Sequence, residues 1–302
     1  MNSWAFGAVV LLVAGFPRAA DATDFHVYYL GGQSNMDGYG YVKKLPPTQA
    51  KLQKGVMVFH GNSAADGAKV DGRGVWAELR PGHGVGFKSD GKINQYSNRF
   101  GVELTFAQSI QEQFPDRRVA IIKYSRGGTS IDASAAGGFG CWEPDFRGAS
   151  GINQYDHFLA TVRQAYADSD IDDDGEVDRL IPAGIIWMQG ESDAHYTPEV
   201  ANRYEVNLKR LMDLVRAAFR VDDLPVVIGR ISYAKKEPPS WKHGEIVRAA
   251  QAQYAKNDDS AAIVNSTDEY GYSDPWHYDS AGYIDLGRKF ADAVSKLERE
   301  ND

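Results

Sequence analysis

The sequence predicts an α/β fold of three layers, in which helices cover both faces of a central parallel sheet. Short apolar runs rich in β-branched residues recur along the chain from residue 25, and longer segments with helical periodicity lie between them. Runs that are apolar throughout are typical of strands buried on both faces. Strands that alternate with helices favour right-handed βαβ crossovers, which build a parallel sheet with helices on each side.

The elements follow in chain order. Strands are predicted over residues 25–30, 119–124, 180–188 and 224–231, with weaker candidates over residues 56–59 and 261–264. Helices are predicted over residues 100–114, 155–167, 198–219, 245–256 and 280–297. Two long loops, over residues 39–98 and 127–153, are rich in Gly, Trp and charged residues. Because loops of this length usually have a function, we expect them to form the walls of a substrate cleft.

Length and composition indicate one large domain, expected over residues 23–302. The chain has 302 residues, of which 43% are apolar and 25% charged, so it can bury a substantial core. Its net charge of -8 argues against nucleic acid or an anionic membrane as a partner, because both require basic patches. A single cysteine, Cys141, leaves no intrachain disulfide to stabilise the fold. The oligomeric state does not follow from the sequence.

The N-terminal segment resembles a signal peptide, expected over residues 1–22. Residues 5–16 are apolar or glycine, a run too short to span a bilayer comfortably, and Ala20-Asp21-Ala22 offers a small-x-small cleavage pattern. Cleavage would give a secreted or periplasmic protein that does not contact the membrane once processed. Residues 1–4 contain no Lys or Arg, which leaves a retained membrane anchor as the alternative.

Ser34 directly follows the first predicted strand, in the segment GGQSNM of residues 31–36. Open α/β sheets bind their ligands at the carboxyl ends of their strands, which makes Ser34 a candidate nucleophile. An ordinary glycine-containing turn is the alternative interpretation.

Asp274 and His277 are separated by three positions in the segment DPWH. A carboxylate at this spacing can hold the imidazole Nδ1–H and leave Nε2 to accept a proton from a hydroxyl. A serine hydroxyl needs such a base at neutral pH. The alternative is a surface turn capped by Asp274.

Two further polar segments follow predicted strands. The glycines of YSRGGTS, residues 124–130, can turn backbone N–H groups toward a ligand, as an oxyanion hole requires; a tight strand exit is the alternative. In WMQGESD, residues 187–193, Gln189 offers an amide donor and Glu191 a carboxylate. A helix N-cap by Ser192 or Asp193 is the structural alternative there.

Five segments together resemble the SGNH hydrolase superfamily, and in particular its sialate O-acetylesterase-like branch, which includes the acetyl xylan esterases of carbohydrate esterase family six. They are GQSNM (32–36), FGVEL (100–104), YSRGGTS (124–130), WMQGESD (187–193) and DPWH (274–277). They occur in the family order over roughly residues 25–295. The resemblance implies a flavodoxin-like parallel sheet and an esterase that removes O-acetyl groups from a carbohydrate, without a cofactor for catalysis.

The resemblance also implies roles for individual residues. Ser34 would be the nucleophile, His277 the general base and Asp274 the carboxylate that orients it, with Glu191 as the alternative acid. The backbone N–H groups of Ser34 and Gly128 and the side chain of Gln189 would form the oxyanion hole. Many SGNH enzymes use an Asn where this chain has Gln189. The candidate substrate-binding residues are Asn35, Arg126, Trp142 and Trp276.

An acidic segment, DIDDDGEVD over residues 170–178, matches the opening of a calcium-binding loop. Its candidate ligands are Asp170, Asp172, Asp174, Glu176 and Asp178. Position twelve of the pattern is Ile181, so the bidentate carboxylate of an EF-hand is missing. We expect either a structural Ca²⁺ or a solvated acidic loop, and no catalytic role.

Two other functions are compatible with the same scaffold. One is a lipase-like or thioesterase-like SGNH hydrolase, which we rank lower because the Trp-rich polar loops suit sugars better than acyl chains. The other is a non-catalytic carbohydrate-binding protein. A binding protein has no need of Ser34, Asp274 and His277 together, which favours the esterase.

Overall fold

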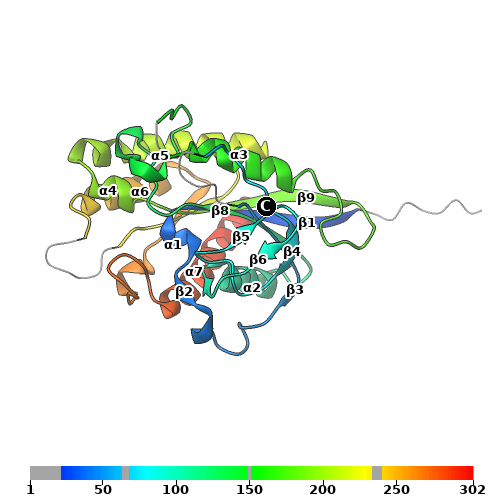
Figure 1. The fold of residues 1–302 in the computed structure, drawn as a ribbon. Helices are drawn as coiled ribbons and strands as arrows, with labels where there is room; N and C mark the ends of the chain where they lie inside the picture. Colours follow the sequence, from blue (N-terminus) through cyan, green and yellow to red (C-terminus); the bar gives the residue numbers. More distant parts are fainter. Residues whose placement is uncertain (1–21, 63–67, 149–150, 233–239, 302) are drawn as a thin grey trace, which may run out of the picture.

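A seven-stranded sheet forms the centre of the computed structural model, which describes residues 22–62, 68–148, 151–232 and 240–301 (Figure 1). The strand order is β11-β10-β9-β1-β8-β3-β4. The strands are β1 (Thr23–Gly32), β3 (Gln53–His60), β4 (Trp76–Leu79), β8 (Arg118–Ser125), β9 (Asp178–Met188), β10 (Val226–Gly229) and β11 (Ala261–Val264). All neighbouring strands pair in parallel except β3 and β4, which are antiparallel.

The sheet confirms the predicted fold class. Strands β8, β1, β9, β10 and β11 are adjacent in that order, which corresponds to the flavodoxin-like order 2-1-3-4-5. Strands β3 and β4 extend the sheet beyond β8. The six predicted strands are all present and pair in parallel, and the additional edge strand β4 is antiparallel to β3. Strand β4 lies inside the segment predicted as a loop, and only four residues pair there.

The five predicted helices are present and form the two outer layers. Helices α2 (Glu103–Gln113) and α7 (Ser280–Asn301) cover one face of the sheet, and α3 (Gln154–Ala165), α5 (Pro198–Phe219) and α6 (Gly244–Asn257) cover the other (Figure 1). Helix α5 shows why its bounds were predictable. Thr197 caps its first turn by accepting the N–H of Val200, Pro198 begins it, and Arg220 ends it in a left-handed conformation.

Several short elements were not predicted. Helices α1 (Ser34–Asp37) and α4 (Glu191–His195) directly follow β1 and β9. The others are β2 (Gly40–Tyr41), η1 (Val42–Lys44), β5 (Lys88–Ser89), β6 (Asn94–Gln95), β7 (Arg99–Phe100), η2 (Ala133–Ala135), η3 (Gly137–Phe139) and η4 (Ser266–Glu269). Each of these elements has two to five residues, which is too short for a hydrophobic periodicity to be recognised in the sequence.

A buried ion pair lies between the sheet and the helix layer of α2. Lys123 of β8 and Glu103 of α2 are both fully buried, with Nζ 2.8 Å from Oε2. Lys123 Nζ also donates to the carbonyl oxygens of Asp37 and His83, each at 2.9 Å. This one side chain therefore connects α1 and the loop after β4 to the core.

The expected signal peptide lies outside the described residues, apart from Ala22. Among the helices that the structure describes, none has the length and apolar character needed to cross a bilayer.

Candidate active site

The turn from β1 into α1 places Ser34 at the carboxyl end of the sheet. Gly32 has a φ of +142°, and a Cβ at this position would lie 2.0 Å from the carbonyl oxygen of Met188 on the neighbouring strand. Only glycine permits so close an approach with this backbone conformation. Ser34 begins α1 and is 8% exposed.

The hydrogen bond expected between Asp274 and His277 is present, with Asp274 Oδ2 2.7 Å from His277 Nδ1. Asp274 Oδ1 accepts the backbone N–H groups of Trp276 and His277, each at 2.9 Å. Burial raises the pKa of Asp274, but the hydrogen bonds from His277 and Trp276 outweigh it, and the pKa lies below its usual value. The carboxylate is therefore ionised and holds Nδ1, which leaves Nε2 to accept a proton from a hydroxyl.

Ser34 and His277 line the same pocket, which has a volume of about 620 Å³. Among the described residues, the structure shows no hydrogen bond between the Ser34 hydroxyl and the His277 imidazole, although both side chains line the pocket. The pocket wall also contains Gln33, Asp37, Tyr39, Val85, Arg126, Gly127, Gly128, Ala135, Phe139, Glu191, Ser192, His195, Tyr196, Trp241 and Trp276. A larger hollow of about 830 Å³ beside α3 and the end of α5 contains none of the predicted catalytic residues.

Two backbone N–H groups can stabilise an oxyanion in this pocket. Ser34 and Gly128 both line it, and within the described residues neither N–H has a hydrogen-bond acceptor. Gly128 has a φ of +76°, and a Cβ there would lie 2.6 Å from the Phe139 ring. The glycine therefore allows the turn to present its N–H beside Ser34.

The prediction that the Gln189 side chain supplies a third oxyanion donor was wrong. Gln189 is fully buried and does not line the pocket. Its Nε2 donates to the Thr129 carbonyl at 3.0 Å and to Asp193 Oδ2 at 2.7 Å, so both of its N–H groups are in use. Its Oε1 accepts the hydroxyl of Tyr204. Gln189 therefore holds the segment next to Gly128 and has no donor left for substrate.

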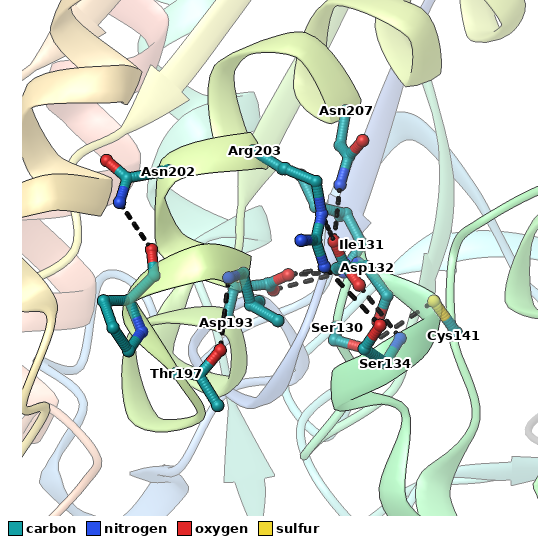
Figure 2. Close-up of polar contacts among 12 residues, drawn as sticks. Ser130, Ile131, Asp132, Ser134, Cys141, Asp193, Thr197, Asn202, Arg203 and Asn207 are labelled. Carbon is teal, nitrogen blue, oxygen red and sulfur yellow. Dashed lines mark hydrogen bonds and ion pairs between the residues drawn. The ribbon is translucent and has the colours of Figure 1, made fainter.

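Asp193 of α4 holds the residues that follow Thr129, as Figure 2 shows. Its carboxylate accepts the backbone N–H groups of Ile131 and Asp132 at 3.1 Å, in addition to the Gln189 amide. Asp132 Oδ2 in turn accepts Arg203 of α5 at 2.8 Å. Burial raises the pKa of Asp193 to about 7, although the hydrogen bonds from Gln189, Ile131 and Asp132 oppose the shift. One carboxylate thus joins α4 to the strand exit that carries Gly128.

Glu191 does not orient His277, which corrects the alternative assignment of the acid. Its Oε1 accepts Asn35 Nδ2 at 2.8 Å, and its Oε2 is buried without a partner among the described residues. Burial raises the pKa of Glu191, and the Asn35 hydrogen bond opposes that shift. Asp274 occupies His277 Nδ1 instead. Glu191 lines the pocket beside Ser34 and His277 without touching the imidazole.

Two of the four predicted substrate-binding residues are buried in the protein instead. Asn35 is 2% exposed; its Nδ2 donates to Glu191, and its Oδ1 accepts the Tyr283 hydroxyl at 2.8 Å. Trp142 is 1% exposed and donates its Nε1–H to Thr129 Oγ1 at 2.9 Å. Neither side chain can reach a ligand in the pocket. Arg126 and Trp276 do line it, and Trp276 is 52% exposed.

Among the pocket residues that sequence reasoning missed, Gln33, Asp37 and Tyr39 make defined contacts around Ser34 and His277. Gln33 is 3% exposed, and its Oε1 accepts the N–H groups of Gly190 and Ser192. Asp37 accepts the Ser125 hydroxyl and, at 3.0 Å, the Gly127 N–H, so it braces the glycine turn. The Tyr39 ring stacks on His277, with ring centroids 3.5 Å apart. Gln33 and Asp37 flank Ser34 in the sequence, and that proximity was the available signal.

The acidic segment lies far from this pocket. Asp170, Asp172 and Asp174 each place one oxygen within 4.8 Å of the others, and Asp178 begins β9, whose other end leads to Gln189. At about 3.3 Å per strand residue, the two ends of β9 are about 30 Å apart.

Comparisons with known proteins agree with the fold and the motifs. A family model described as "Carbohydrate esterase, sialic acid-specific acetylesterase" matches residues 24–296. Among curated proteins, none matches the chain in sequence.

Solved structures share the fold at low sequence identity. A protein from Arabidopsis thaliana has a TM-score of 0.63 at 18% identity, covering 91% of this chain and 99% of its own. A carbohydrate acetylesterase from Xanthomonas citri has a TM-score of 0.59 at 17% identity, covering 91% of this chain and 57% of its own. NanS has a TM-score of 0.58 at 16% identity, covering 93% of this chain and 100% of its own. Because the family model spans nearly the whole described fold, the chain belongs to the family of sialic acid-specific acetylesterases among the carbohydrate esterases, and it is a carboxylic ester hydrolase.

Proposed function

We propose that this enzyme removes O-acetyl groups from a sugar or polysaccharide through an acetyl-serine intermediate. The observation that carries the proposal is the 2.7 Å hydrogen bond between Asp274 and His277 at the edge of the pocket that Ser34 lines. A base with a fixed tautomer beside a serine is the requirement for nucleophilic catalysis at neutral pH.

The mechanism uses groups of this chain alone. Ser34 Oγ attacks the acetyl carbonyl carbon while His277 Nε2 takes its proton, and the N–H groups of Ser34 and Gly128 stabilise the oxyanion. His277 then gives the proton to the departing sugar oxygen, which leaves acetyl-Ser34. Water attacks the acetyl carbon, His277 accepts a proton from it, and acetate departs as the proton returns to Ser34 Oγ.

A carbohydrate fits the character of the pocket wall. The rings of Tyr39, Tyr196, Trp241 and Trp276 line it together with the cationic Arg126, and saccharides are commonly bound by aromatic faces and polar side chains. Asp37 and Glu191 on the same wall keep the pocket from being uniformly cationic, so acetylated xylan and acetylated sialic acid are both candidate substrates. The expected signal peptide would deliver the enzyme to extracellular or periplasmic polysaccharide.

The test compares wild type with Ser34→Ala on p-nitrophenyl acetate, acetylated xylan, acetylated sialic acid and acetylated monosaccharides, with acetate release as the readout. We expect wild type to hydrolyse at least one carbohydrate ester and Ser34→Ala to lose that activity. Rapid quenching of wild type should yield a peptide with one acetyl group on Ser34. Turnover that survives in Ser34→Ala would overturn the mechanism. Sugar binding without hydrolysis by wild type would favour a binding protein.

A further inference from the structure

Residues 169–178 form a closed acidic loop between α3 and β9. The backbone N–H of Asp178 donates to the Ser169 carbonyl at 2.8 Å and closes the loop at its base. Asp170 accepts the N–H groups of Asp174 and Gly175, both at 3.0 Å, so the loop wraps around its first carboxylate. Figure 1 shows the loop in green where β9 and β1 begin, with α1 and α4 at the opposite end of these strands.

Three carboxylates of the loop converge. One oxygen from each of Asp170, Asp172 and Asp174 lies within 4.8 Å of the others. The ion pair that the structure shows for these three side chains is between Asp172 and Arg118, whose guanidinium is 49% exposed. Because the half-exposed Arg118 pairs with Asp172, the negative charges of Asp170 and Asp174 repel each other at close range.

A fourth carboxylate supplies an independent indication of a ligand. Asp178 is 9% exposed, and its Oδ2 accepts the N–H of Ile171, the residue between Asp170 and Asp172. This contact sets the Asp178 carboxyl against the acidic turn. Its Oδ1 is buried and has no hydrogen-bond partner within the described residues.

Asp172 Oδ1 is buried without a partner as well. Leaving one such oxygen unpartnered costs about 1–3 kcal/mol, and a solvated surface loop would not accumulate two. The two oxygens belong to a loop whose ion pair, among the described residues, is the half-exposed contact between Arg118 and Asp172.

We propose that this loop binds one Ca²⁺, with ligands from the side chains of Asp170, Asp172 and Asp174 and with Asp178 at the ninth position of the pattern, where such loops often contact the ion through a water. Carboxylate oxygens are the ligands that hard divalent cations prefer, and Ca²⁺ accepts six to eight of them in flexible geometry, whereas Mg²⁺ requires a compact octahedron. Glu176 occupies the position at which loops of this kind use the backbone carbonyl.

The affinity is expected to be modest because position twelve, Ile181, offers no side-chain oxygen. A Kd of about 10⁻⁴ to 10⁻³ M is typical of weak extracellular calcium sites. The ion would stabilise the entry to β9, about 30 Å along the strand from the pocket. A test of calcium binding can therefore fail without affecting the proposed esterase mechanism, and the reverse also holds.

The experiment uses the full chain after removal of divalent ions with EDTA and dialysis. Isothermal titration with CaCl₂ should show one site per chain, and CaCl₂ at ten times Kd should raise Tm by about 3 °C. MgCl₂ at the same concentration should bind at least about tenfold more weakly, as the geometric preference of Mg²⁺ requires. No heat and no Tm shift up to about 10 mM CaCl₂, well above the expected Kd, would overturn the proposal. An equal response to MgCl₂ would do the same, because it would indicate nonspecific counterion accumulation.

Matched variants locate the site. The double variant Asp172→Asn, Asp174→Asn should lose the calcium-dependent Tm shift and keep wild-type ester turnover, which also shows that it folds. The control double variant Asp222→Asn, Asp223→Asn removes two exposed carboxylates after α5 and should retain the shift. A shift that persists in the first variant places the ion elsewhere and overturns the proposal. If that variant does not fold, the number of Ca²⁺ ions bound per wild-type chain still tests the proposal.

Discussion

Asp274 holds the His277 imidazole inside a turn whose ends are themselves hydrogen-bonded. Asp274 Oδ2 lies 2.7 Å from His277 Nδ1, and the Ser273 N–H donates to the His277 carbonyl at 2.9 Å. The stacked ring of Tyr39 covers one face of the imidazole. The proposed base and the carboxylate that orients it therefore lie in one hydrogen-bonded turn, and only the proposed nucleophile, Ser34, comes from a distant part of the sequence.

This turn predicts different outcomes for the two acidic candidates. Asp274→Asn should lower kcat on p-nitrophenyl acetate by about a thousandfold or more, because the amide favours the wrong imidazole tautomer. Glu191→Gln should lower kcat by about tenfold or less, because its oxygen can still accept the Asn35 amide and His277 keeps its partner. If only the Glu191 change abolishes turnover, Asp274 is not the catalytic acid.

Gln189 should behave as a structural residue. Gln189→Met leaves Thr129 O, Asp193 Oδ2 and the Tyr204 hydroxyl each with one partner fewer, so the free energy of unfolding should fall by about 1–3 kcal/mol. Chemical denaturation measures this directly. A pocket-facing oxyanion donor would give the opposite pattern, with unchanged stability and kcat reduced about a hundredfold or more.

The buried pair of Lys123 and Glu103 should dominate the stability of the region under the pocket. Lys123→Met leaves the Glu103 carboxylate buried and unpaired, which should cost about 3–5 kcal/mol of unfolding free energy. The double variant Lys123→Met, Glu103→Gln should recover part of this loss, because no uncompensated charge remains. Equal losses in the single and double variants would show that the carbonyl contacts of Lys123, and not the ion pair, stabilise the region.

An exposed pair serves as the control for that measurement. Lys209 and Asp213 lie four residues apart on α5, with side chains 67% and 49% exposed. Solvent screens such pairs, so Lys209→Met should change the unfolding free energy by about 0.5 kcal/mol or less.

The fold was predictable because its main elements carry strong local signals. The predicted strands each contain a short apolar run. Helix α5 has a capping Thr197, an initial Pro198 and several turns of amphipathic periodicity, so its bounds were predicted to the residue. Strand β4 was not predictable, since its four residues alternate weakly and pair only through tertiary contact with β3. The short helices α1 and α4 depend in the same way on the strands that they follow.

Site contacts between residues close in the sequence were predictable. Contacts that depend on how side chains pack in the fold were not. Asp274 and His277 lie three positions apart, so their hydrogen bond followed from spacing. The sequence shows that Asn35, Trp142 and Gln189 are polar or aromatic residues near the motifs, but not which way they point. Each found partners inside the protein, because a buried amide or indole N–H is costly unless it is hydrogen-bonded.

Asp193 should make stability depend on pH. Its pKa is raised from 3.8 to about 7 by burial, so between these values the folded state keeps a proton that the unfolded state has lost. The stabilisation from this proton is complete below the unfolded pKa and disappears as pH rises through about 7. Relative to Asp193→Asn, wild type should lose at most about 4 kcal/mol of unfolding free energy from pH 4 to pH 8.

Denaturant titrations of wild type and Asp193→Asn at several pH values give this difference directly. Subtraction removes carboxylates common to both proteins, including Asp274, whose lowered pKa gives the opposite trend at lower pH. The variant Asp116→Asn provides the control, because it removes an exposed carboxylate instead of a buried one. A difference between wild type and Asp193→Asn that stays flat, or grows in favour of wild type as pH rises, would mean that the three N–H donors outweigh burial and keep Asp193 ionised.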